Sequence, residues 1–148
     1  MLQVAYLMTP KPSVTDSQCF RIARDASRIC SGLKLTGRCY ARLRTGMARD
    51  CLLVIEGEAR MARRFVDGVL QDKRLSHGVV LLERSAQRAC FEDYSVWVDC
   101  PSDLMLPDGL RCTTRDAGVV PRDLPGSLRI HVEAFLSADR ATTRALAG

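Results

Sequence analysis

The sequence predicts an α+β fold of the ferredoxin-like plan, in which two helices cover one face of a shared sheet. Three observations support this prediction: short apolar runs bounded by turn residues, two segments with apolar residues every three or four positions, and a last strand in which apolar and polar residues alternate. The elements follow the order β-α-β-β-α-β-β, and a C-terminal loop and helix come after them. With 148 residues, the chain is long enough for one domain with a sizeable core.

The first strand and the first helix are the clearest elements. The strand is predicted at 2–8, where an apolar run ends before a Thr-Pro-Lys-Pro segment. Thr15 and Gln18 then have the spacing of a capping box, which indicates a helix start. Behind this box the apolar residues recur at helical spacing, namely Cys19, Ile22, Ala23, Ala26, Ile29, Cys30 and Leu33. We expect the helix to end near Gly32, because glycine readily takes a positive φ.

The middle of the chain predicts a hairpin followed by a second helix. Its strands are expected at 35–43 and 51–56, joined by a glycine-containing turn at 44–47. The second of these strands reads CLLVIEG, an apolar run that stops at a carboxylate and a glycine. We expect Glu56 to begin the second helix, where a carboxylate complements the helix dipole, and Gly57 to make the turn into it. The apolar stripe of that helix consists of Met61, Ala62, Phe65, Val66, Val69 and Leu70.

The last two predicted strands precede a segment of different composition. An apolar run at 78–82 predicts the fourth strand, and alternation over 94–98 predicts a half-exposed fifth strand. We therefore assign 1–99 to the ferredoxin-fold domain and 100–148 to a C-terminal extension, which begins with a loop rich in proline and glycine. Residues 127–136 fit both a strand and a helix. Helix is favoured, because the alanine-rich end of the chain continues it.

Composition and charge exclude several classes of protein. The net charge is +5, but the arginines are scattered and aromatic residues make up only 5%, so no nucleic-acid interface is expected. The seven cysteines include no C-x-x-C pair, which favours free thiols in a reducing cytoplasm. The N-terminus has neither a signal peptide nor an apolar run long enough for a bilayer. The expected protein is cytoplasmic and does not bind membranes.

No pattern in the sequence predicts an enzyme. The sequence contains no G-x-S-x-G, P-loop or G-x-G-x-x-G motif. His77 and His131 have no acid or nucleophile pattern near them, so neither is a catalytic candidate. No metal site is expected either, because the histidines lie far from the cysteines in sequence.

Five short pieces coincide in order with those of one family. They are Tyr6 in the first strand, Leu35-Thr36-Gly37 after the first helix, Ile55-Glu56-Gly57 at the end of the third strand, Gln71-Asp72-Lys73-Arg74 after the second helix, and Arg88-Ala89-Cys90-Phe91 before the fifth strand. Over about 2–99 the chain therefore resembles the BLUF domain, a flavin-binding sensor of blue light. The resemblance implies an FAD ring between the two helices, hydrogen-bonded by a strand tyrosine, a strand glutamine and a helix asparagine. It also implies that light drives electron and proton transfer from the tyrosine, after which the glutamine rearranges and the fifth strand carries the signal.

The chain departs from the family at the positions that do this chemistry. Tyr6 matches the tyrosine, but the glutamine position holds Leu53 and the asparagine position holds Cys30. The histidine position holds Leu75, and the Trp-x-Met of the last strand corresponds to 94–96. Leucine offers no hydrogen bond and a thiol only a weak one, so two of the three polar partners of a flavin are missing. We therefore expect no photocycle and no bound cofactor.

These departures leave three hypotheses of function. The first is a BLUF-fold regulatory or protein-interaction module without flavin, in which Tyr6, Cys30 and Leu53 are only pocket positions. Its partner, another protein or a second copy in a dimer, would bind the sheet face and the C-terminal segment through Trp97, Leu128, Val132 and Phe135. The second is a blue-light photoreceptor that still binds FAD. The third is a sensor that binds another ligand such as haem, and rests on Cys30, Cys51 and the apolar walls.

Overall fold

The computed structural model describes residues 1–42, 50–99, 110–112 and 119–147. The turn predicted at 44–47 lies outside these residues. Within these residues nine elements follow one another: β1 (Leu2–Pro10), α1 (Asp16–Gly32), β2 (Thr36–Arg42), β3 (Cys51–Gly57), α2 (Ala59–Leu70), β4 (Leu75–Ser85), β5 (Tyr94–Asp99), β6 (Leu110–Cys112) and α3 (Gly126–Ala147).

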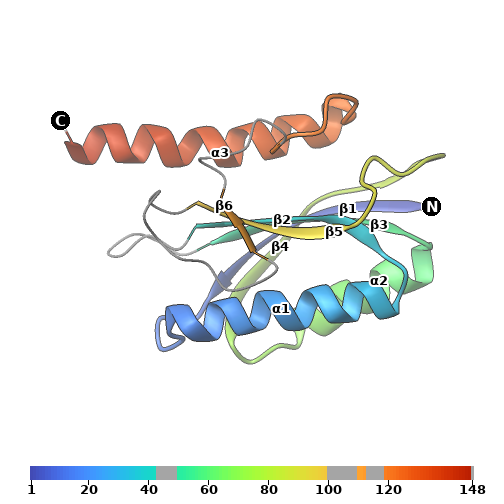
Figure 1. The fold of residues 1–148 in the computed structure, drawn as a ribbon, viewed down its shortest axis with the longest axis horizontal. Coiled ribbons are helices and arrows are strands. Elements are labelled where there is room, and N and C mark those ends of the chain that lie inside the picture. The colour runs from blue at the N-terminus through green and yellow to red at the C-terminus, as the bar shows by residue number, and fades with distance from the viewer. Residues whose placement is uncertain (43–49, 100–109, 113–118, 148) are drawn as a thin grey trace.

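The strands form one mixed sheet between two helical layers. Its order is β4-β1-β3-β2-β5-β6. β1 pairs antiparallel with both β3 and β4, whereas β2 pairs antiparallel with β3 and parallel with β5. Helices α1 and α2 lie on one face and α3 lies on the other (Figure 1). The predicted α+β fold with two helices on one face is thus confirmed, while β6 was not predicted from the loop-rich sequence around it.

α1 begins as the sequence predicts and ends differently. The Thr15 hydroxyl accepts from the backbone N–H of Gln18, and the Gln18 side chain accepts from the N–H of Thr15, which completes the capping box. Gly32 remains inside the helix, however, and the cap is Leu33. The positive φ falls on Lys34, at 55°. The expectation that Gly32 supplies the left-handed residue is therefore wrong.

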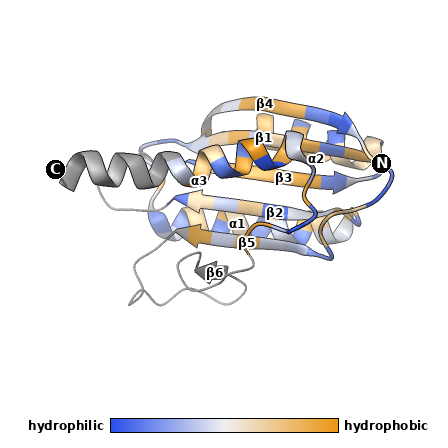
Figure 2. Cartoon of the chain, turned by 90° about the horizontal axis from the view of Figure 1, so that it is seen from above, coloured by the Kyte–Doolittle hydropathy of each residue, from blue (hydrophilic) through white to orange (hydrophobic). Residues whose placement is uncertain are grey.

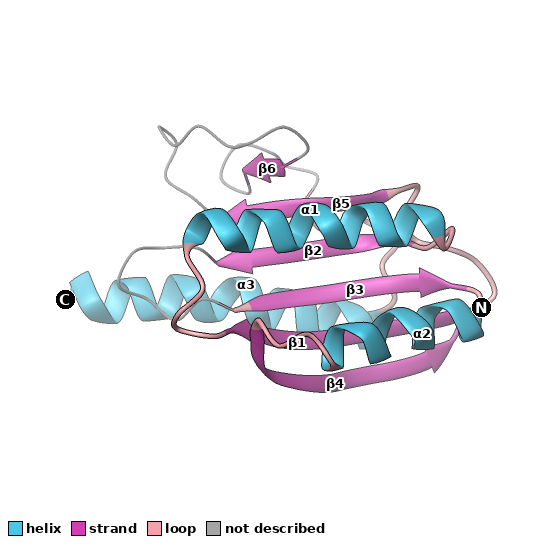
Figure 3. Ribbon diagram, turned by 90° about the horizontal axis from the view of Figure 1, so that it is seen from below, coloured by secondary structure: helices cyan, strands magenta, loops and turns pink. Residues whose placement is uncertain are grey.

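One core lies between the sheet and the first helical layer (Figure 3). Alternate residues of the central strands point into it, among them Val4 and Tyr6 of β1 and Leu53 and Ile55 of β3. The apolar sides of α1 and α2 close it through Cys30 and through a group on α2, Ala62, Phe65 and Val66. This packing explains why both predicted amphipathic stripes exist.

A second core lies between the sheet and α3 (Figure 2). Leu128, Val132 and Phe135 follow one another along one side of α3 and are buried against Trp97 of β5. The helix expected at 127–136 is thus confirmed. The same packing corrects the predicted docking face, because the four residues assigned to a partner cover one another within the chain.

None of the helices among the described residues is both long enough and apolar enough to cross a membrane.

Glu56 has a different place from the one predicted. It lies in β3, fully buried, and the helix begins at Ala59 with Glu58 as its N-cap. The carboxylate accepts hydrogen bonds from the backbone N–H groups of Cys90 (2.8 Å) and Phe91 (2.7 Å), and from the side chains of Gln3 (2.9 Å) and Thr36 (3.0 Å). Such a set of donors offsets the cost of burying a carboxylate. Glu56 therefore fixes the loop before β5 to the centre of the sheet.

We predict that Glu56→Gln lowers the free energy of unfolding by about 2–4 kcal/mol, because the new amide NH2 would face groups that are themselves donors. The matched control is Glu58→Gln at the exposed N-cap of α2, where the loss should stay below about 1 kcal/mol. Urea unfolding monitored by circular dichroism measures both. Equal losses for the two variants would show that the Glu56 network contributes no more than a surface cap.

Candidate functional site

The three positions singled out in the sequence come together in the helix-side core. Tyr6 of β1 lies directly opposite Leu53 of β3 in the antiparallel register. Tyr6 is 1% exposed, and Leu53 and Cys30 are completely buried. All three belong to the same apolar cluster. The site that the sequence suggests is thus a set of packed side chains from β1, β3 and α1.

The Tyr6 ring packs against Gly78 of the neighbouring strand β4, where the absence of a side chain leaves room for it. A Cβ atom placed at Gly78 of β4 would lie 1.4 Å from the Tyr6 hydroxyl oxygen and 2.5 Å from Cζ. The ring therefore occupies the space that any side chain at residue 78 would fill. Burial raises the pKa of the Tyr6 hydroxyl, so it stays protonated at neutral pH.

The chemistry available at Cys30 and Leu53 is limited. Leu53 has no polar side-chain atom, and burial raises the pKa of the Cys30 thiol to about 12. The thiolate is the form that attacks electrophiles and binds metals, so this cysteine is unreactive at neutral pH. Within the described part of the chain, no group of three or more metal-binding side chains is arranged to hold an ion.

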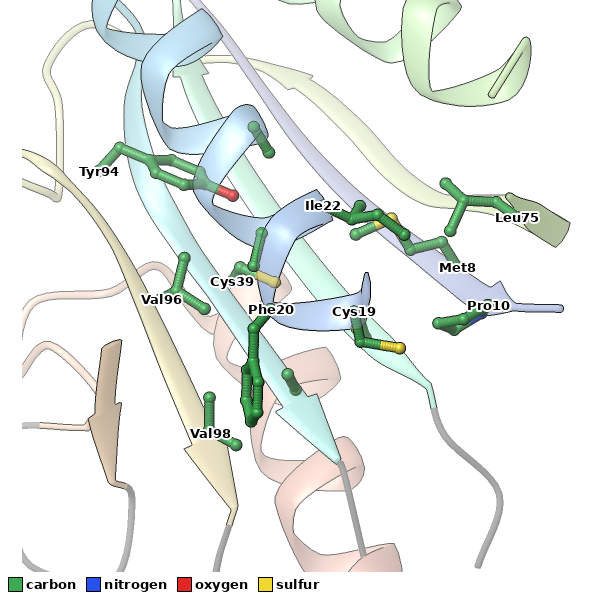
Figure 4. Close-up of a pocket in the computed structure, with 14 residues that line it drawn as sticks. Met8, Pro10, Cys19, Phe20, Ile22, Cys39, Leu75, Tyr94, Val96 and Val98 are labelled. Carbon is green, nitrogen blue, oxygen red and sulfur yellow. The ribbon is translucent and has the colours of Figure 1, made fainter. Parts of the chain in front are cut away.

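Tyr94 is a site residue that the sequence analysis did not select. It lies on β5 opposite Gly37, and its ring reaches beneath α1 beside Cys39 (Figure 4). Its buried hydroxyl lies close to the Cys39 thiol, a weak hydrogen-bonding group, and forms no hydrogen bond of normal geometry among the described residues. Burial first, and then the nearby thiols of Cys39, Cys30 and Cys51, raise the pKa of this hydroxyl. The alternation of 94, 96 and 98 was the available signal, since it places Tyr94 on the same side as the two buried valines.

A small apolar cavity adjoins Tyr94. Its volume is about 30 Å³, and its walls come from α1 and from the strands β1, β2, β3, β4 and β5. They include Cys19, Cys39, Cys51 and Leu75, of which the last is the position that a histidine occupies in the family pattern. A space of this size accommodates about one water molecule and no ring system.

A larger groove separates α1 from α2. It has a volume of about 260 Å³, with apolar walls that include Ile22, Phe65 and Val69. At one end Arg74 pairs with Asp72 at 2.7 Å and approaches Asp25 of α1 at 3.7 Å. The hydrogen bonds from Arg74 lower the pKa of Asp72, which favours its charged form. This groove lies where the resemblance would place a flavin.

The fold is that of a mixed ferredoxin-like sheet with a helix pair on one face, and solved structures of this kind include a light-regulated adenylyl cyclase and a BLUF protein. The chain is similar to a bacterial light-regulated adenylyl cyclase, with a TM-score of 0.60 and 11% identity over 99% of this chain and 36% of that one. It thus spans about a third of the cyclase. It is also similar to BlsA in its photo-activated state (TM-score 0.57, 14% identity, 67% of this chain and 70% of that one).

A third similar structure is the dark state of BlrB, a BLUF protein, with a TM-score of 0.55 and 18% identity over 66% of this chain and 70% of that one. No family model matches the sequence, and no curated protein does. At these identities the likeness describes the fold, and the chain has a BLUF-like fold.

We predict that Gly78→Ala destabilises the protein by about 1–3 kcal/mol, because the new Cβ would overlap the hydroxyl and Cζ of the buried Tyr6 ring and force it to shift. The matched control is Gly68→Ala on α2, where a Cβ meets nothing within 4 Å. That change should stabilise the helix by about 0.5–1 kcal/mol. Thermal and urea unfolding measure both, and a neutral Gly78→Ala would contradict the packing of Tyr6 described above.

We also predict that Tyr94→Phe changes the stability by less than about 0.5 kcal/mol or increases it, because it removes a buried hydroxyl without a partner. Tyr40→Phe is the control, since the Tyr40 hydroxyl donates to the carbonyl of Val119 at 2.7 Å. Its loss should cost about 1 kcal/mol. If Tyr94→Phe proved the more costly change, the hydroxyl would have a polar partner in solution.

Proposed function

We propose that this chain is a regulatory or protein-interaction module on a BLUF-like fold, without the residues of a flavin photocycle. The observation that supports it is the pairing of Tyr6 with Leu53 in a core that also buries Cys30. The tyrosine has an aliphatic neighbour where the family pattern places the glutamine. A side chain with no hydrogen-bonding group cannot rearrange its hydrogen bonds.

The residues of the core do not fit the polar edge of a flavin. That edge carries carbonyl and ring nitrogen groups, and each buried group without a partner costs about 1–3 kcal/mol. Leu53 supplies no donor or acceptor, and Cys30 supplies a weakly donating thiol. The proposal therefore includes no bound cofactor and no catalytic step.

A second candidate is a photoreceptor that holds FAD in the groove between α1 and α2. The groove volume of about 260 Å³ and the presence of Tyr6 favour it. A third candidate is haem bound through Cys30 or Cys51. It ranks last because burial raises the pKa of Cys30, while contact with the Cys39 thiol and burial raise that of Cys51, which disfavours thiolate ligands.

An absorption spectrum of the purified protein distinguishes these candidates. After incubation with excess FAD and gel filtration, we expect no retained flavin band and no change on illumination. The double variant Leu53→Gln, Cys30→Asn restores both polar partners, and we expect it to bind FAD more tightly than the wild type. The control combines Leu53→Gln with Ser31→Asn, which adds the amide at the exposed neighbour of Cys30 instead.

Stoichiometric flavin in the wild type, with a reversible shift of its band to longer wavelength in blue light, would replace the proposal with the photoreceptor. A Soret shift on titration with haem would favour the third candidate. Equal flavin affinity in the double variant and its control would show that the amide at position 30 does not decide binding.

A further inference from the structure

β4 forms one edge of the sheet. It is the longest strand in the described part of the chain, from Leu75 to Ser85, and β1 is its only strand neighbour there. The outer side of such a strand presents backbone N–H and C=O groups that pair readily with another strand. The register against β1 also shifts between Val80 and Leu82, which leaves Leu81 without a residue opposite.

The middle of β4 exposes apolar side chains on both faces of the sheet. Val79 is 53% exposed and Val80 is 45% exposed. Val79 lies opposite Leu7 and Val80 lies opposite Tyr6, so the two valines point to opposite faces. A partner that packed on one face of the sheet would cover only one of the two valines. A strand added at the edge would cover both.

The charged residues of β4 are directed away from its edge. Glu83 pairs with Arg63 of α2 at 2.9 Å, and Arg84 donates to the Ser127 hydroxyl of α3 at 2.9 Å. One charge thus lies against each helical layer. Charges that project along an edge commonly prevent strand addition. Gly78, Val79 and Val80, by contrast, are exposed and uncharged.

We propose that two copies of this chain associate through β4, antiparallel about a two-fold axis, so that one sheet runs through the dimer. An antiparallel edge is complementary to itself under a two-fold rotation, which favours a second copy over an unrelated strand. In the register that places Val80 opposite Val80, Arg84 lies opposite Ser76 and Glu83 lies opposite position 77. No like charges then face each other across the axis.

The dimer rests on the proposed function in one respect: it names a second copy of this chain as the partner of the interaction module. The two can fail separately. A flavin-binding chain could still dimerise through β4, and a colourless chain could be monomeric.

Light scattering coupled to gel filtration, over a range of protein concentrations, tests the dimer. We expect a dimer for the wild type and at least about tenfold weaker association for Val80→Lys, because the two lysines would face each other at the axis. Ile130→Lys is the matched control: Ile130 is 66% exposed on α3 and should tolerate the change without effect on assembly. Circular dichroism checks that both variants fold.

Hydrogen exchange gives an independent measurement that needs no variant. Backbone amides at 78–82 should exchange more slowly at concentrations where the dimer forms than at dilution. A wild type that stays monomeric at every concentration, a Val80→Lys protein that remains a dimer, or equal weakening by Ile130→Lys would overturn the proposal. Should Val80→Lys fail to fold, Val79→Lys places each lysine opposite the apolar Leu81 of the other copy, on the other face of the sheet, and should also weaken association by at least about tenfold. Unchanged association of this variant would overturn the proposal.

Discussion

Burial of the sheet on both faces is the constraint on which the rest of this structure depends. Residues 52–56 of β3 are all buried, because alternate side chains enter the core under α1 and α2 and the core under α3. A strand in this position must be apolar throughout, and its one charge must find partners within the protein. Glu56 finds four of them. Burial on both faces therefore explains both why 52–55 are apolar and why the Glu56 carboxylate needs four hydrogen-bond donors.

Double coverage also determines where the molecule has surface to offer. Trp97 and the buried side of α3 form an internal core, so the sheet face beneath α3 is not available to a partner. Arg38 strengthens this closure, since its guanidinium donates to the Val119 carbonyl and lies over the rings of Phe91 and Trp97. In the described part of the chain, the β4 edge of the sheet and the groove between α1 and α2 remain open.

Local patterns predicted most elements, and contacts distant in sequence account for the errors. The capping box at Thr15 and the apolar run at 51–55 each specify an element from neighbouring residues alone. The place of Glu56 depends on donors up to 53 residues away, which a Glu-Gly pair cannot reveal. For the site, the sequence selected Tyr6, Cys30 and Leu53, which the structure brings into one core. Tyr94 was not selected, because the alternation in β5 predicts its side of the sheet but does not show that α1 and the Cys39 and Cys51 thiols lie near its ring.

The fit between Tyr6 and Gly78 has a consequence for how this sequence can change. Each residue fills or vacates the space that the other requires, so their substitutions are energetically coupled. A smaller residue at position 6 would leave a void beside Gly78. Only after that substitution would a side chain at position 78 have room. We therefore expect the two positions to change together, although they lie on neighbouring strands and 72 residues apart along the chain.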